Sequence, residues 1–288
     1  PVLVQDEIVN GEGEGAEMRG VRRAIRRFAP GVGERLDHGV YEQSKAGIEE
    51  ALFESGFLRA KAVKHRVEVS RKANTANIDL LYQSGPRMKF GQVRFSESQF
   101  QPDFLRRFIP WDEGQYYSPD ELLEFQQRLT DADYFASVAV VPDISSDTGT
   151  EVPIDVTLTP AKRSVYSAGV FMSTDTGPGV RLGLNRRWMN EKGHKLNAEI
   201  IYAQRLTSLT TGYRIPLKGR NERSYNFGAN YRDETTDTST SRTERLTANE
   251  TRQWKGFTRT LGMTYVSGNF EIAENQEYSS LFYFEGTL

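Results

Sequence analysis

The feature that most constrains this chain is an alternation of apolar and polar residues that begins near residue 164 and recurs toward the C-terminal end. In its first run, Tyr166, Val170 and Met172 share one face, while Ser167 and Gly169 lie on the other. A period of two residues is typical of a β-strand. The second face is small, glycine-rich or charged. This favours a wall with an apolar outside and a wet inside, as in a membrane-spanning β-barrel.

The same alternation predicts about eight strands of roughly nine to twelve residues, a length that crosses a bilayer when the strand is tilted. The strands are expected near 164–173, 180–188, 194–202, 209–215, 225–232 and 260–265, with two less regular segments near 245–254 and 278–284. A soluble antiparallel sandwich also alternates. However, a face rich in Tyr, Phe and Trp near strand ends suits the aromatic belts of a membrane protein better than a buried core.

Composition limits the remaining possibilities. The length of 288 residues suggests two or three units, and a net charge of −2 gives no general attraction to nucleic acid. A mean hydropathy of −0.60 without a long apolar run argues against a transmembrane helix. The absence of cysteine excludes disulfides and thiol catalysis, and it fits a protein of the cell envelope. Because the chain starts at Pro1 within a strand-like run, we expect it to be a piece of a longer protein.

The residues before 164 contain a repeat of about 80 residues, in which each copy is predicted as one strand, two helices and two strands. Three landmarks recur at nearly the same offset: Arg26-Arg27-Phe28-Ala29-Pro30 with Arg106-Arg107-Phe108-Ile109-Pro110, Ile78-Asp79-Leu80 with Ile154-Asp155-Val156, and 55–57 with 133–135. Proline ends the first helix of each copy because it cannot continue a helix. Chance is a poor explanation for three landmarks at similar spacing.

The pattern also sets approximate element bounds. In the first copy we expect strands near 2–9, 60–70 and 77–83, helices near 17–28 and 41–55, and a flexible turn at 11–15. In the second copy we expect strands near 88–95, 137–143 and 152–158, and helices near 102–108 and 118–129. The predicted fold class is therefore α+β plus all-β, with two βααββ domains at 1–85 and 86–163, followed by the first half of a β-barrel at 164–288.

Tandem βααββ repeats followed directly by wet-inside strands resemble the outer-membrane assembly-factor superfamily, whose members include BamA-like and TamA-like proteins. These proteins carry periplasmic POTRA repeats and a C-terminal barrel. Four segments are most similar to the TamA-like (translocation and assembly module subunit) branch: Tyr166-Ser167-Ala168-Gly169-Val170, 173–178, 188–194 and Tyr213-Arg214-Ile215-Pro216-Leu217. The similarity is most specific over the first two barrel hairpins and looser in the repeats.

The resemblance implies a location and a function. The protein would lie in the outer membrane of a Gram-negative bacterium, in contact with outer-membrane lipid, with its POTRA repeats in the periplasm. It would take unfolded outer-membrane protein clients to a lateral seam of the barrel and work with a TamB-like, inner-membrane-anchored periplasmic partner in autotransporter and envelope biogenesis. The physical mechanism is addition of a client strand to an open sheet edge.

The resemblance also implies site residues. The seam strand would consist of Val165, Tyr166, Ser167, Ala168, Gly169, Val170, Phe171 and Met172. In the family fold the second strand of each repeat is a sheet edge, which here places Val63, His65 and Val67 on one edge and Val138 and Val140 on the other. Lys61, Lys64, Arg66 and Pro142 are residues that guard such edges. Arg181, Arg187 and Arg214 would line the lumen.

The chain also departs from the family pattern. TamA-like proteins have three POTRA repeats and sixteen strands, and the family's Val-Arg-Gly-Phe motif and terminal aromatic strand are missing here. We therefore expect the middle of such a protein, with a half-barrel whose last strand would pair with further sequence or another chain, because open sheet edges do not survive in lipid.

No catalytic constellation is visible, so we expect no enzymatic activity, metal or cofactor. His38, His65 and His194 lie in separate elements and are expected to face solvent. The acidic pairs at 49–50 and 233–234 are expected on a solvated helix face and in a loop. The glycine-rich segment 11–15 lacks the Lys-Ser/Thr of a phosphate loop. Arg22, Arg23, Arg26 and Arg27 could hold phosphate or an acidic partner, although such a run also suits a solvated helix.

Four alternative functions stay open at this point. The chain could belong to a BamA-like core assembly factor, to a two-partner secretion transporter, or to a passive pore with periplasmic tethers. A soluble periplasmic scaffold with a sandwich domain is the fourth. Client insertion, secretion into the medium, ion conductance and membrane fractionation would separate them.

Overall fold

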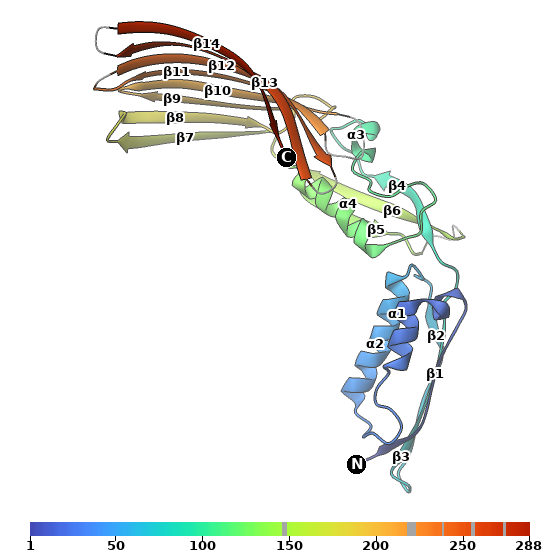
Figure 1. Cartoon of the computed structure of the whole chain (residues 1–288). Coiled ribbons are helices and arrows are strands. Elements are labelled where there is room, and N and C mark those ends of the chain that lie inside the picture. The colour runs from blue at the N-terminus through green and yellow to red at the C-terminus, as the bar shows by residue number, and fades with distance from the viewer. Residues whose placement is uncertain (146–148, 218–222, 238, 255–256, 273–274) are drawn as a thin grey trace. The chain divides into compact units, whose positions relative to one another are not determined.

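The computed structural model describes residues 1–145, 149–217, 223–237, 239–254, 257–272 and 275–288 (Figure 1). Its described strands form two three-stranded sheets and one eight-stranded sheet. The chain forms two compact units. The first contains Pro1–Ser96, Trp111–Gln127 and Ala139–Thr157, and the second contains Glu97–Pro110, Arg128–Val138 and Leu158–Leu288.

The first repeat has the predicted strand–helix–helix–strand–strand order. Its elements are β1 (Leu3–Glu12), the short 3-10 helix η1 (Glu14–Glu17), α1 (Arg19–Arg26), α2 (His38–Glu54), β2 (Lys61–Ser70) and β3 (Thr75–Gln83). The sheet order is β1-β3-β2, with β1 parallel and β2 antiparallel to β3. The predicted flexible turn at 11–15 is wrong in part, because β1 continues to Glu12 and η1 begins at Glu14.

Helix α2 begins three residues before its predicted start because of its cap. The Asp37 carboxylate accepts hydrogen bonds from the backbone N–H groups of Gly39 (2.8 Å) and Val40 (3.2 Å). Such an N-cap satisfies donors that have no partner within the helix. The helix ends as predicted at Gly56, whose φ of 89° lies in the left-handed region that favours glycine.

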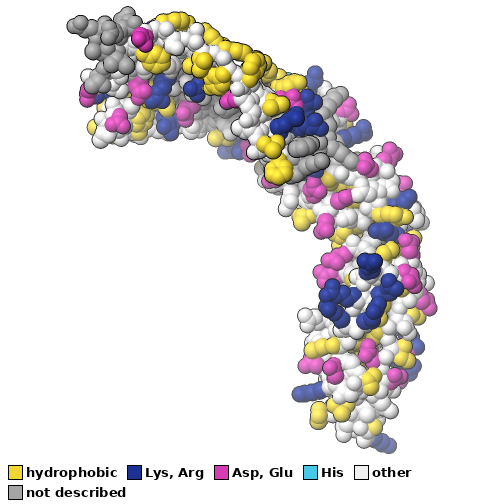
Figure 2. Space-filling model, viewed as in Figure 1, with side chains coloured by type: hydrophobic (Ala, Val, Ile, Leu, Met, Phe, Trp, Pro, Cys, Tyr) yellow, Lys and Arg dark blue, Asp and Glu magenta, His cyan; other side chains and the backbone are white. Residues whose placement is uncertain are grey.

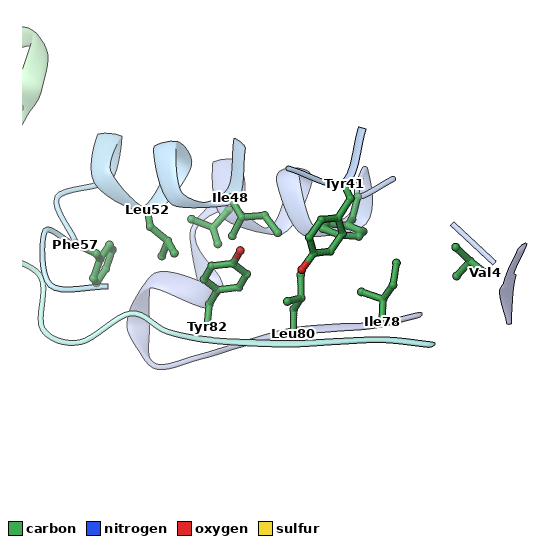
Figure 3. Packing of buried hydrophobic residues seen from close by; sticks show 10 residues of the cluster. Val4, Tyr41, Ile48, Leu52, Phe57, Ile78, Leu80 and Tyr82 are labelled. Carbon is green, nitrogen blue, oxygen red and sulfur yellow. The ribbon is translucent and has the colours of Figure 1, made fainter. Parts of the chain in front are cut away.

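The core of the first repeat lies between α2 and the central strand. Tyr41, Ile48 and Leu52 of α2 point toward residues of β3, and Ile78 and Leu80 are at most 1 % exposed (Figure 3). The remaining core residues are Val4, Val21, Phe28, Phe57 and Tyr82. This packing explains why β3 alternates between buried and more exposed residues and lies in the middle of the sheet.

The second repeat has the same order and the same sheet topology. Its elements are β4 (Lys89–Phe95), α3 (Pro102–Arg106), α4 (Pro119–Asp131), β5 (Phe135–Pro142) and β6 (Glu151–Pro160), and the sheet order is β4-β6-β5. In its core the rings of Phe90 and Trp111 stack with centroids 3.9 Å apart, and Phe125 meets Trp111 edge-on at 5.2 Å. Stacked and edge-on pairs of this kind are favourable in a core.

The two repeats agree at the landmarks that the sequence analysis used. Helices α1 and α3 end at Arg26 and Arg106, and Ile78 and Ile154 are both buried in a central strand. The third landmark is offset by one residue. Asp133, with a φ of 59°, follows α4 as Gly56 follows α2, so 133 corresponds to 56 rather than to 55. The reason is that a positive φ closes each helix.

The third sheet consists of consecutive antiparallel strands in the order β14 to β7. The strands are β7 (Ser164–Ser173), β8 (Gly177–Arg186), β9 (Lys195–Ala203), β10 (Leu206–Pro216), β11 (Arg223–Thr235), β12 (Ser239–Trp254), β13 (Phe257–Ile272) and β14 (Asn275–Thr287). The number of strands agrees with the prediction. Four of them exceed the predicted length, since β11 and β14 have 13 residues and β12 and β13 have 16. Within the described part of the chain, no helix is long and apolar enough to span a membrane.

Candidate functional site

Strand β7 forms one end of the eight-stranded sheet, and among the described residues it pairs only with β8. Its outward face is apolar and uncovered, because Tyr166, Val170 and Met172 are 77, 86 and 82 % exposed. On its other face, the central positions Ser167 and Gly169 are small. Gly169 stands opposite Arg181, and a side chain added at Gly169 would meet nothing within 4 Å. The strand therefore has few side-chain contacts that hold its free edge in place.

The apolar face of β7 continues across the sheet. On the neighbouring strands the residues that alternate toward this face are mostly aliphatic or aromatic, and Figure 2 shows hydrophobic side chains gathered along the margin of the sheet. Exposed members of this face are Leu182, Ile200, Tyr202, Leu209, Tyr225, Phe227, Leu246, Leu261, Met263, Tyr265, Phe282 and Phe284. An exposed apolar surface of this extent is typical of contact with lipid or with another protein.

Ion pairs bracket this apolar face on β11 and β12. At one end Arg223 Nε lies 2.7 Å from Glu250 Oε1, and at the other Arg242 Nη2 lies 2.9 Å from Asp233 Oδ2. From 223 to 233 the strand advances by roughly 33 Å. With a strand tilt of about 40°, the pairs are about 25 Å apart in height, which matches the apolar band of an outer-membrane barrel.

The prediction that 233–234 lies in a loop is wrong, since both residues belong to β11.

The apolar band also runs diagonally across the hydrogen-bond register. Its upper limit is Met172 on β7 but Leu246 on β12. If the paired residues are followed from Leu246 strand by strand to β7, the residue reached is Tyr166. The limit thus shifts by six residues, from 172 to 166, over five strand steps. Strands about 4.8 Å apart with a tilt of about 40° require a shift of about 4 Å per step, or about six residues in all. The band therefore has the slope expected of tilted strands in a layer of constant thickness.

The opposite face of the sheet is polar and internally hydrogen-bonded. Asn226 donates to Asn249 Oδ1 (2.9 Å), Asn230 donates to Thr210 (2.8 Å), and Thr264 donates to a carboxylate oxygen of β14 (3.0 Å). Thr264 is only 1 % exposed. Side chains that satisfy one another in this way suit the inner wall of a barrel, where water and neighbouring strands supply partners.

The three arginines predicted to line a lumen occupy different positions. Arg181 lies on the polar face of β8, 3.7 Å from Glu199, and Arg214 lies on the polar face of β10. Arg187 does not lie in a strand, because β8 ends at Arg186. Its guanidinium bonds to Asp133 Oδ2 at 3.0 Å and to the backbone carbonyl of Lys162 at 3.1 Å. A lumen role for these residues stays a prediction.

Arg187 opens a turn, 187–194, that packs on residues of the second repeat. The buried Tyr134 hydroxyl donates to the Gly193 carbonyl at 2.6 Å, and burial raises the pKa of Tyr134. Gly193 has a φ of 73°, and a Cβ there would collide with the Phe104 ring. Lys195 Nζ donates to the carbonyl of Ala132, the residue that follows α4, at 2.7 Å, where the helix dipole favours a cation. The turn is thus fixed by sterics and hydrogen bonds together.

His194 lies in this turn and is not solvent-facing as predicted. It is half-buried, and its Nδ1 is 2.8 Å from the Tyr213 hydroxyl. Burial lowers its pKa, and the charges of Lys192 and Arg107 lower it further. His38 and His65 are exposed. Their rings stack on Tyr41, with centroids 6.3 Å away for His38 and 6.1 Å away for His65. Among the residues described, no group of three or more His, Cys, Asp or Glu side chains could hold a metal ion.

In the first repeat, β2 is a sheet edge along its whole length. All ten residues are exposed, including Val63, Val67 and Val69 at 48, 38 and 48 %. His65 and Val67 stand opposite the core residues Leu80 and Ile78, so they extend the helix-facing side of the sheet. There His65 stacks on Tyr41 of α2, whereas Val67 is exposed. The strand also carries ion pairs of Lys64 with Asp79 and of Arg66 with Glu68.

In the second repeat, β5 is an edge of a different character. Val140 is 8 % exposed and belongs to the core, and Val138 is half-buried, whereas Val141 is 56 % exposed. The side chains predicted for strand addition at this edge thus contact the repeat itself. The exposed side chains of β5 are Ala136 and, on the other face of the strand, Ser137, Ala139 and Val141.

Sequence reasoning did not identify the contact between the turn and the second repeat. Tyr134, Phe104 and Lys195 belong to elements about 30 to 90 residues apart, and no alternation relates them. The one available signal was Gly193, which falls in a short polar turn between two predicted strands.

The fold and the site define a class of protein. Residues 88–161 match the family model of the POTRA domain, described as surface antigen variable number repeat. The chain therefore combines a POTRA domain with an eight-stranded antiparallel sheet, one face of which is an apolar band between ion pairs.

Solved structures share this arrangement. BamA from Haemophilus ducreyi lacking POTRA domains 1–3 is similar with a TM-score of 0.72 at 14 % identity, over 99 % of this chain and 58 % of that one. CdiB from Escherichia coli gives a TM-score of 0.56 at 13 % identity, over 99 and 55 %. CdiB from Acinetobacter baumannii gives 0.52 at 11 % identity, over 98 and 57 %. The chain spans a little over half the length of these proteins and has the fold of the corresponding part, which includes half of a BamA-like barrel.

Proposed function

We propose that this chain is part of a BamA/Omp85-superfamily assembly factor, of the TamA-like branch, that inserts client proteins into the outer membrane of a Gram-negative bacterium. The observation that carries the proposal is a POTRA domain followed directly by a sheet whose apolar face is bracketed by ion pairs, about 25 Å apart in height for strands tilted by about 40°. Both three-stranded repeats share one topology, which supports a POTRA assignment and a periplasmic location for each.

In this proposal β7 is the seam strand. Its backbone pairs with β8 on one side, and the described residues leave its other side open to a client strand. Strand addition supplies a full row of backbone hydrogen bonds, which a strand entering lipid requires. The small residues Ser167, Ala168 and Gly169 make few side-chain contacts, so the edge can exchange one neighbouring strand for another.

The repeats hold the client before it reaches β7. The exposed β2 edge offers unpaired backbone groups beside the apolar side chains of Val67 and Val69. An extended client segment can add to this edge as a further strand and place every second, apolar side chain against Val67 and Val69. The role requires binding and release of strands and no covalent chemistry.

The finer assignment to the TamA-like branch rests on the four segments that resemble it. Two of these, 166–170 and 173–178, lie in β7 and in the turn that leads to β8, and a third, 188–194, forms most of the turn that contacts Tyr134. A TamB-like, inner-membrane-anchored periplasmic partner and autotransporter clients belong to this finer proposal.

Single cysteines on β7 test the seam. The chain has no cysteine, so Val165→Cys or Ser167→Cys introduces the only thiol. We expect either variant to crosslink to a client that carries cysteines in its terminal strand, in intact cells. Thr247→Cys, on the same face of the interior strand β12, is the matched control and is expected to give no adduct. Absence of adducts at every β7 position would contradict the proposal.

Depletion of the protein separates the remaining functions. Loss of client insertion, with the client accumulating in the periplasm, supports an assembly factor. Loss of a soluble protein from the culture medium would instead indicate a secretion transporter. Conductance in planar bilayers without any effect on clients would indicate a passive pore. A general loss of outer-membrane proteins would favour a BamA-like core role over the TamA-like one.

A further inference from the structure

Helix α1 carries a stripe of arginines that the proposed function does not use. Arg19, Arg22, Arg23 and Arg26 are spaced i, i+3, i+4 and i+7, so they share one face of the helix, and all four are exposed. The opposite face holds Val21, which is 1 % exposed and belongs to the core. Figure 2 shows basic side chains gathered over the helical side of the first repeat.

This stripe is costly for the free helix. Like charges three and four residues apart repel each other and destabilise a helix. Arg19 also lies in the first turn, where the helix dipole disfavours a cation, whereas Arg23 and Arg26 lie in the last turn, where it favours one. The first turn contains no acidic residue, and the N-cap Met18 makes no side-chain hydrogen bond. Within the described part of the chain, the one ion pair of the four arginines joins Arg22 to Glu17 at 4.0 Å.

The fold of the repeat does not require the stripe. In the second repeat, α3 occupies the place of α1 and carries two basic residues at its end. Arg106 lies 3.8 Å from Asp103, and the guanidinium of Arg107 stacks on Phe104 at 4.3 Å from the ring centroid. Both of these arginines contact side chains of their own repeat, whereas among the described residues only Arg22 of the α1 stripe has an ion-pair partner, Glu17 at 4.0 Å.

We infer that the exposed face of α1, defined by Arg19, Arg22, Arg23 and Arg26, is a docking surface for an acidic segment of a partner polypeptide. The stripe extends for about 10 Å along the helix, a span covered by alternate side chains of an extended chain. Guanidinium groups bind carboxylates in paired hydrogen bonds, which suits arginine better than lysine. The inference does not depend on the proposed insertion function.

A protein partner fits the surface better than a membrane does. Helices that bind anionic membranes combine cations with exposed apolar residues that enter the lipid. In α1 the apolar residues Val21, Ala24 and Ile25 are packed against the core of the repeat. The surface can therefore supply charge but no apolar anchor. Because the net charge of the whole chain is −2, an acidic partner is attracted to this stripe and not to the protein surface in general.

A labelled peptide of alternating glutamate and serine tests the inference by fluorescence anisotropy with the whole chain in detergent. A variant with Arg19, Arg22, Arg23 and Arg26 replaced by glutamine is expected to bind at least about tenfold more weakly at low salt, since four exposed charge pairs are lost. The control variant replaces the exposed residues Arg35, Arg71, Lys72 and Lys162 by glutamine, which removes the same charge outside α1 and the β2 edge. It is expected to bind within about threefold of the wild type.

Three results would overturn the inference. One is equal binding by the α1 variant and the wild type, and another is equal binding of a peptide with glutamine in place of glutamate. The third is binding of the stripe to phosphatidylglycerol vesicles without binding of the peptide, which would assign a membrane surface instead. The α1 variant is expected to melt at or above the temperature of the wild type because repulsion is relieved, so weaker binding would not reflect unfolding.

Discussion

At the scale of single residues, Gly56 has two functions in the fold. Its φ of 89° closes α2, and a Cβ at this position would lie 2.9 Å from the Tyr117 carbonyl of the second repeat. Its own carbonyl accepts a hydrogen bond from Met88 N at 2.9 Å, and Arg87 Nε bonds to the Ser55 carbonyl at 3.0 Å. The end of one helix is thus also the attachment point of the next repeat.

We expect Gly56→Ala to lower the free energy of unfolding by about 1–3 kcal/mol, because alanine resists the positive φ and collides with Tyr117. Gly47→Ala, inside α2 with nothing within 4 Å of the new methyl group, is the control and should be neutral or stabilising by up to about 1 kcal/mol. Urea unfolding followed by tryptophan fluorescence measures both. Equal midpoints for the two variants would show that Gly56 is not constrained.

The sequence predicted Gly56 correctly because a glycine after a periodic helix has a local cause. It placed His194 in solvent because the burial of that ring has no local cause. The ring is covered by the way 187–194 folds onto the second repeat, and its partner Tyr213 lies on another strand. Residues whose environment is set by distant segments are those that pattern reading misses.

At the scale of elements, the turn 187–194 depends on pH through His194. Burial, and then Lys192 and Arg107, lower the pKa of His194 in the folded protein. The unfolded chain therefore takes up the proton first as pH falls below about 6.5. Stability from this group is fully present above that pH and is lost as pH falls toward the lowered pKa. We expect the melting temperature to fall between pH 7.5 and 5, and to fall less in His194→Gln.

The same comparison at matched pH provides the control, because all other titrating groups are present in both proteins. An identical pH dependence in wild type and variant would show that His194 does not contribute.

The alternation of apolar and polar residues located all eight strands of the large sheet. It extended β8 too far, because Arg187 and Trp188 continue the pattern but are held by contacts with the second repeat, including Arg187 with Asp133 and Trp188 with Phe100 at 6.0 Å.

At the scale of the whole molecule, the direction of the apolar face is testable by substitution. Ala229 lies on the exposed apolar face of β11, midway between the bracketing ion pairs, and Asn230 lies on the polar face next to it. We expect Ala229→Arg to cost about 2–4 kcal/mol of stability in lipid, and Tyr231→Arg near the edge of the band to cost about 0–1 kcal/mol more than its lost packing.

Asn230→Arg is the matched control, since it places the same charge one residue away on the other face. Folding into lipid vesicles, followed by resistance to protease and by denaturant titration, measures all three variants. A larger loss of stability at Asn230 than at Ala229 would mean that the faces are reversed.

Which residues lie on the apolar face and which on the polar face could be predicted from the sequence alone. The diagonal slope of the band could not, because it depends on the register between strands, which alternation leaves undetermined.

The unequal lengths of the strands have a consequence for how the sheet crosses a bilayer. Strands β7, β8 and β9 have only 9 or 10 residues, whereas β12 and β13 have 16. At about 3.3 Å per residue, one flank of the sheet is shorter than the other by roughly 20 Å along the strands. Nine or ten residues suffice to cross a bilayer when a strand is tilted, so the additional residues of β12, which precede Leu246, extend beyond the apolar band. We expect this flank of the sheet to stand out of the lipid into water, within reach of a protease or an antibody added from that side.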